Sequence, residues 1–87
     1  MPYIKPDDRP PLDEMSLAVM NHLSSLGDLN YLLTMILLNY ARRKGDINSY
    51  KTHLEIVGTL ECVKNEWYRR STAPLEDQKM KLNGDAF

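Results

Sequence analysis

The segment from residue 29 to residue 41 constrains the fold more than any other part of this 87-residue chain. Only Asn30, Thr34 and Asn39 are clearly polar in it, so a helix over these residues is apolar on every side. Such a helix cannot leave one side in water without a large free-energy penalty, and partners have to cover nearly all of its faces. A chain of this length can hardly supply that cover alone. We therefore expect this helix to form the centre of a homo-oligomeric helical bundle, at least a dimer.

The composition narrows the class of protein. The chain has 43% hydrophobic and 26% charged residues and neither repeats nor low-complexity tracts, which predicts a single helical domain over residues 1–87. A net charge of −1 gives no general basic field, so we do not expect a nucleic-acid partner. A lone cysteine, Cys62, fits a reducing compartment. The N-terminus lacks a signal-peptide pattern and the apolar run is shorter than the roughly 20 residues of a bilayer span, so we expect a cytoplasmic protein without a membrane partner.

Prolines and a glycine divide the N-terminal part. Four of the five prolines fall within the first 11 residues, which predicts an extended, polyproline-like arm over residues 1–10 because each proline disfavours helix in the residue before it. Pro11 suits a first helical position, and apolar residues then recur at helical spacing. Gly27 is expected to end this first helix in a left-handed conformation.

Capping residues mark the ends of the expected helices in the rest of the chain. Asp28 is expected to cap a second helix, and three cations followed by Gly45 give that helix a strong stop. Ser49 is expected to cap a third helix, which Pro74 breaks or kinks before a short last one. The expected helices are residues 11–26, 28–44, 49–72 and 75–82, with a tail over residues 83–87. The fold class is therefore all-α, with three main helices and a short fourth.

Three polar residues fall inside the apolar arc of the third helix, namely His53, Glu61 and Lys64. An ionised group facing an apolar interior needs a partner, and Glu61 and Lys64 are three residues apart. One interpretation is an ion pair at the rim of an interface, with His53 beside it. The other is a polar pocket between subunits, in which Lys64 offers charge, Tyr68 a hydroxyl and Glu61 an acceptor. A third and weaker interpretation uses His53 and Glu61 as acid and base, although nothing supplies a nucleophile or an oxyanion hole.

The end of the third helix mixes aromatic residues with cations over residues 64–70. This combination binds phosphates through the guanidinium fork and bases by stacking. The alternative is structural, with Trp67 in the core and Arg69 and Arg70 supporting the helix dipole. No second ligand at metal spacing accompanies either histidine, so we expect no metal ion and no cofactor.

Several short motifs resemble a family of small uncharacterised helical proteins of bacteria, archaea and tailed phages. The motifs are Pro2-Tyr3-Ile4 with Arg9, Gly27-Asp28-Leu29-Asn30-Tyr31, Glu61-Cys62-Val63-Lys64, Trp67-Tyr68-Arg69-Arg70, and Ala73-Pro74 with Glu76-Asp77. The resemblance covers nearly the whole chain and implies a helical protein, but it carries no reaction. Its marked residues are Arg9, Asp28, Asn30, Tyr31, Glu61, Lys64, Tyr68 and Arg70. An aromatic residue is expected at position 75, where this chain has Leu75.

These observations lead to one main functional hypothesis and two alternatives. The main one is a non-enzymatic oligomer that holds a small anionic, nucleotide-derived ligand between subunits, by analogy with phage proteins that sequester the nucleotide signals of bacterial immunity. Its expected ligand-binding residues are Arg9, Asn30, Tyr31, Glu61, Lys64, Tyr68 and Arg70. The first alternative is a protein-interaction or assembly module without a small-molecule site. The second is a small hydrolase that uses Glu61 and His53.

Overall fold

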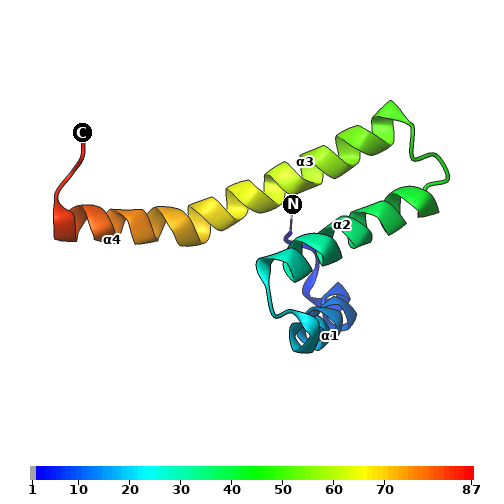
Figure 1. Cartoon of the computed structure of the whole chain (residues 1–87), viewed down its shortest axis with the longest axis horizontal. Coiled ribbons are helices and arrows are strands. Elements are labelled where there is room, and N and C mark those ends of the chain that lie inside the picture. Colours follow the sequence, from blue (N-terminus) through cyan, green and yellow to red (C-terminus); the bar gives the residue numbers. More distant parts are fainter. Residues whose placement is uncertain (1) are drawn as a thin grey trace. The chain divides into compact units, whose positions relative to one another are not determined.

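The computed structural model describes residues 2–87, and every regular element in this range is a helix (Figure 1). The elements are the 3₁₀ turn η1 (Pro6–Asp8), α1 (Pro10–Ala18), the 3₁₀ turn η2 (Val19–His22), α2 (Leu26–Arg43), α3 (Tyr50–Trp67), the π-helical turn η3 (Tyr68–Thr72) and α4 (Ala73–Asn83). Residues 3–56 form one unit, and residues 57–87 with Pro2 form another. The all-α prediction is therefore confirmed.

The N-terminal arm is not extended throughout. Pro6–Asp8 form the turn η1, in which the amide of Asp8 donates to the carbonyl of Lys5 and the amide of Arg9 to that of Pro6, at 3.0 and 3.2 Å. Lys5 keeps the extended backbone that a following proline imposes, whereas Pro6 itself has the φ of a first helical residue. The prediction of an extended arm was wrong at residues 6–8, because a proline favours extension before it and helix after it.

The first helix is shorter than predicted, and α2 begins earlier. α1 ends at Ala18 and passes through η2, after which Leu23 is extended, so Gly27 does not end a helix. Ser25 caps α2 instead, because its hydroxyl accepts the amide of Asp28 at 3.1 Å. The Asp28 carboxylate in turn accepts the amide and hydroxyl of Ser24, both at 2.9 Å. This reciprocal arrangement resembles a capping box, and it corrects our assignment of Asp28 as the N-cap.

The stop of the second helix is confirmed. Gly45 has a φ of +86°, the left-handed region, and its amide donates to the carbonyl of Arg42 at 3.0 Å. In the following turn the Asp46 carboxylate accepts the amide of Asn48 at 3.0 Å. Because this turn is short, the end of α2 and the first turns of α3 lie beside each other (Figure 1).

Pro74 does not break the third helix. The π-helical turn η3 joins α3 to α4, and the residues at its junctions, Trp67, Thr72 and Ala73, all have right-handed helical backbones. The amide of Ala73 donates to the carbonyl of Tyr68, five residues back. Pro74 has no amide hydrogen to donate, and its ring crowds the carbonyl four residues before it. The wider turn accommodates both features, so the helix continues to Asn83. Of the predicted break or kink at Pro74, the break does not occur.

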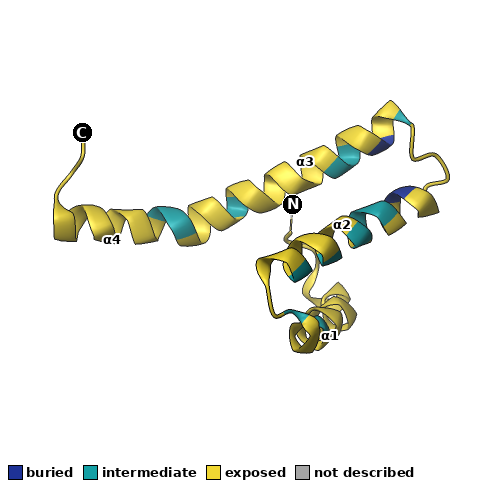
Figure 2. Ribbon diagram, viewed as in Figure 1, coloured by how far each residue is buried: buried dark blue, intermediate teal, exposed yellow. Residues whose placement is uncertain are grey.

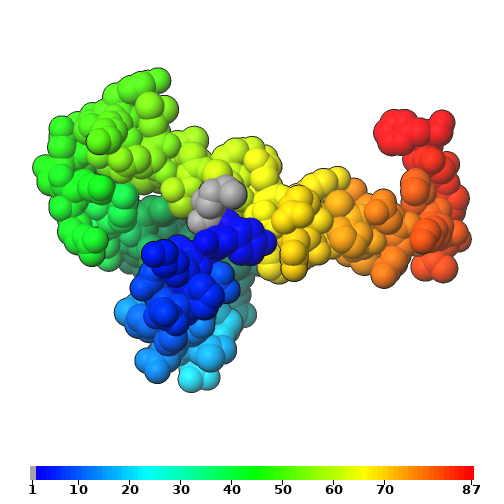
Figure 3. Space-filling model, turned by 180° about the vertical axis from the view of Figure 1, so that it is seen from behind, coloured from blue at the N-terminus to red at the C-terminus, as the bar shows by residue number. Residues whose placement is uncertain are grey.

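Little apolar surface is buried. Among residues 2–87 only Ala41 and Thr52 are buried, with exposed fractions of 5% and 6%, and both lie where the end of α2 meets the start of α3 (Figure 2). Trp67, for which we had considered a core position, is exposed. The last residues extend beyond α4, and Phe87 is fully exposed (Figure 3). No described helix combines the length and the hydropathy that crossing a membrane requires.

Candidate functional site

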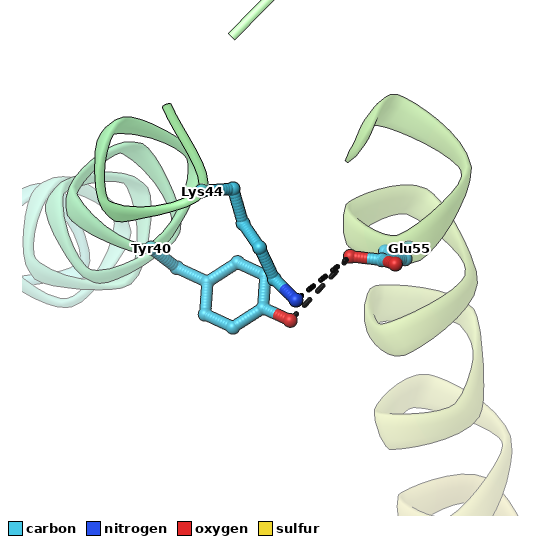
Figure 4. A network of polar contacts seen from close by, with 3 residues as sticks. All are labelled: Tyr40, Lys44 and Glu55. Atoms are coloured by element: carbon cyan, nitrogen blue, oxygen red, sulfur yellow. Dashed lines mark hydrogen bonds and ion pairs between the residues drawn. The ribbon is translucent and has the colours of Figure 1, made fainter. Parts of the chain in front are cut away.

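A small polar network joins the end of α2 to α3 (Figure 4). The Tyr40 hydroxyl donates to Oε2 of Glu55 at 3.4 Å, and Lys44 Nζ lies 3.9 Å from the same oxygen. Lys44 Nζ also lies 5.3 Å from the centroid of the Tyr40 ring, within cation–π range. The network holds the Tyr40 ring in place on the surface of α2. The sequence does not reveal this network, because Tyr40 and Glu55 are 15 residues apart and no local pattern connects them.

A shallow cleft of about 280 Å³ lies between α2 and the start of α3. It is lined by Thr34, Leu37, Leu38, Ala41, Ile47, His53 and Ile56. The Thr34 hydroxyl donates to the carbonyl of Asn30 at 2.8 Å, one helical turn back. His53 is therefore the one titratable group in a cleft with mostly aliphatic walls. This bond uses the backbone of Asn30 and not its side chain.

A second cleft, of about 320 Å³, lies between η2 and α2. It is lined by Val19, His22, Leu23, Asp28, Tyr31 and Leu32. The amide and hydroxyl of Ser24 hold the pKa of Asp28 below its usual range, because both donate to the charged form. Of the ligand-binding residues predicted in this unit, Tyr31 is thus placed in a cleft beside a carboxylate. Arg9 lies outside this cleft, and its Nε donates to the carbonyl of Ile4 at 2.9 Å.

The predicted ion pair on the third helix is present. Lys64 Nζ lies 3.0 Å from Oε1 of Glu61, and both side chains are mostly exposed. The Tyr68 hydroxyl donates to Oε2 of Glu76 at 2.9 Å, across the π-helical turn. This bond to a carboxylate raises the pKa of Tyr68 above its ordinary value, because it stabilises the protonated phenol next to a negative charge. The ion pair that the first of our three interpretations contains is thus present, whereas its position at the rim of an interface stays a prediction.

Arginines 69 and 70 differ in their surroundings. Arg69 pairs with Glu66, three residues earlier in α3. Arg70 is exposed, and within residues 2–87 its side chain has no hydrogen bond or ion pair. Lys64, Tyr68 and Arg70 thus belong to the same helical segment, whereas Arg9, Asn30 and Tyr31 belong to the other unit. One pocket that contains all seven predicted ligand-binding residues remains a prediction.

An apolar stripe on α2 is the feature that sequence analysis did not resolve. Leu29, Leu33, Ile36 and Tyr40 follow one another at spacings of four, three and four residues, which places them within about 60° of the helix circumference. We call these four residues the α2 seam. Between 40% and 54% of each residue is exposed. The spacing was present in the sequence, but a helix that is apolar all round does not reveal which stripe its own chain leaves uncovered.

The fold and these surfaces define a class: small all-α proteins whose helices present apolar faces. The chain belongs to the family described as a domain of unknown function, DUF6899, whose model matches residues 1–86. No curated protein and no solved structure matches the chain. Membership agrees with the prediction that the chain belongs to an uncharacterised family.

Proposed function

We propose that this protein is a non-enzymatic assembly protein whose helices associate with further copies of the same chain. One observation carries the proposal: Ala41 and Thr52 are the only buried side chains among residues 2–87. Ordering the backbone costs about 1–2 kcal/mol for each residue, and burial of apolar surface is the main term that offsets this cost. Two small buried side chains offset little of it. Association supplies the missing burial.

The extent of exposed apolar surface supports the same proposal. Large apolar side chains are exposed on α1, α2, α3 and α4 alike. Soluble monomers rarely expose contiguous apolar patches of more than a few hundred Å². A homo-oligomer covers such faces without a second kind of protein, because each copy presents the same apolar surface to the others.

Sedimentation velocity of the whole chain over a hundred-fold range of concentration tests the proposal, with circular dichroism as a parallel measure of folding. We expect a mass of at least twice 10.1 kDa and a melting temperature that rises with concentration, because association stabilises the folded state. A species of 10.1 kDa that unfolds cooperatively at every concentration would contradict the proposal.

A second candidate function is the binding of a small anionic ligand between subunits, by analogy with the phage proteins mentioned above that sequester nucleotide signals. It is favoured by Arg70, an exposed guanidinium without a carboxylate partner that lies in a π-helical turn. π-helical turns occur frequently at functional sites, and the guanidinium fork suits a phosphate. By contrast, an anion at Lys64 or Tyr68 has to compete with Glu61 or Glu76.

Thermal unfolding with inorganic phosphate, a nucleoside monophosphate or a cyclic dinucleotide tests this second candidate. We expect at least one of these probes to raise the melting temperature of the wild type. Arg70→Ala should abolish the shift without changing the oligomeric mass. Arg69→Ala is the matched control, because Arg69 already pairs with Glu66, and it should keep most of the shift. Absence of a shift with all three probes, or its equal loss in both variants, would count against anion binding.

A further inference from the structure

The α2 seam has the spacing of a coiled-coil contact surface. Successive gaps of four, three and four residues are the a and d positions of a heptad, which meet a partner helix along one line. The other sides of α2 pack against the rest of its own unit. Leu32 and Met35 are half-buried on one side, and Leu37 and Leu38 are half-buried on the other. The seam is therefore a bounded surface of fixed direction.

The order of residues along the seam suits an antiparallel pair of identical helices. The centre of the seam lies midway between Leu33 and Ile36. A two-fold axis through this point places Leu33 opposite Ile36 of the second copy, and Leu29 opposite Tyr40 of the second copy. Every apolar side chain of the seam then faces another one. The antiparallel direction also brings the positive end of each helix dipole beside the negative end of the other.

The same two-fold axis brings opposite charges at the two ends of α2 towards each other. Arg43 and Asp28 lie at opposite ends of α2 but on the same flank of the seam, about 50° and 110° from its centre. A two-fold axis perpendicular to the helices keeps each flank on its own side. It brings Arg43 of one copy level with residue 26 of the other, about 3 Å along the axis from Asp28. The Asp28 carboxylate is bonded to Ser24, but it has further acceptor positions for a guanidinium.

From this complementarity we infer that α2 forms an antiparallel pair with α2 of a second copy along Leu29, Leu33, Ile36 and Tyr40, flanked by two pairs of Arg43 with Asp28. The inference rests on the proposed function and specifies which surface the assembly uses. The apolar centre supplies most of the binding energy, while the charged flanks set direction and register. In a parallel pair Arg43 of one copy and Asp28 of the other stay at opposite ends of the helices, fifteen residues or about 22 Å apart along the axis, so neither charge pair can form.

Disulfide cross-linking in a Cys62→Ser background distinguishes the two directions. In the antiparallel pair, two copies of position 29 are eleven residues apart along the axis, about 16 Å, which a disulfide cannot span. Leu29→Cys alone and Tyr40→Cys alone should therefore give no cross-linked dimer. A mixture of the two variants, tagged so that their masses differ, should give the heterodimer. Leu17→Cys mixed with Tyr40→Cys is the matched control and should give none, because Leu17 lies on α1.

The outcomes separate this inference from the proposed function. Self-cross-linking of either single variant indicates a parallel or different contact and overturns the inference. So does an oligomeric Cys62→Ser protein in which the heterodimer does not form, and in that case the assembly proposal still stands. Since Tyr40→Cys also loses the bond to Glu55, a mixture of Leu33→Cys and Ile36→Cys tests for the heterodimer again without touching that network. Two copies of either of these positions are only about 4.5 Å apart along the axis, so self-cross-linking of the single variants is not part of this second test. A Cys62→Ser protein that is monomeric at all concentrations contradicts both proposals.

Discussion

Ile36→Ala is the substitution that measures the seam most directly. Ile36 lies next to the centre of the seam and is 54% exposed in the single chain. Burying a whole Ile side chain is worth about 1.5–3 kcal/mol, so covering the exposed half is worth roughly 1 kcal/mol in each copy. The dimer contains two copies, and truncation should cost about 2 kcal/mol of association free energy, or roughly thirty-fold in the dissociation constant. Because about half of this residue is exposed in the single chain, helix content should change less than association.

Sedimentation equilibrium of the wild type and the variant over a wide range of concentration measures the two dissociation constants. Leu17→Ala is the matched control, because Leu17 is 71% exposed but lies on α1, outside the seam. We expect the control to stay within about threefold of the wild type, since surface substitutions away from a contact usually change free energies by less than about 0.5 kcal/mol. The reasoning is refuted if Ile36→Ala associates as tightly as the wild type, or if Leu17→Ala weakens association equally.

Three further predictions concern stability. Hydrogen bonds lower the pKa of Asp28, so its contribution to the stability of the fold is fully present above the unfolded pKa of about 3.9 and is lost as pH falls through the folded pKa. The melting temperature of the wild type should therefore converge on that of Asp28→Asn in acid. Gly45→Ala should destabilise the fold by about 1 kcal/mol because of its positive φ, whereas Gly58→Ala, in open space within α3, should stabilise it by a similar amount in urea titrations. Because the pKa of Tyr68 is raised, its contribution to the stability of the fold is complete below about pH 10 and is lost as pH rises through the folded pKa. Glu76→Gln should shift the midpoint of the phenol absorbance titration to a lower pH. The first prediction is contradicted if the difference in melting temperature between the wild type and Asp28→Asn stays the same in acid. The second is contradicted if both glycine substitutions change the stability equally, and the third if Glu76→Gln leaves the midpoint of the phenol titration unchanged.

Features that depend on residues within one or two helical turns were predictable. The stop at Gly45 follows from its place after three cations, and the pair of Glu61 and Lys64 follows from their separation of three residues. The start of α2 was also encoded locally, in Ser24 and Ser25, but Asp28 matched the preferences of a cap equally well and we assigned the role to it. The turn at Pro74 was harder, because the choice between a break and a π-helical turn depends on small differences in backbone energy.

Contacts between distant residues were not predictable in the same way. Nothing in the sequence connects Tyr40 to Glu55, since that contact depends on how α2 and α3 pack after the turn. The candidate ligand-binding residues illustrate the same limit. The side-chain chemistry of Arg70 and Lys64 made both of them candidates. Only the neighbours of each residue distinguish an exposed guanidinium without a partner from an ammonium paired with a carboxylate.

The sequence by itself determined that this chain is helical, where its second helix stops, and that this helix is apolar on every side. Those properties depend on periodicity, capping and composition, which are local. Only the tertiary structure decided which sides of α2 the chain covers and that the seam remains half exposed. A helix that is apolar on every side has no preferred face of its own, so the direction of its contacts is set by the helices packed against it.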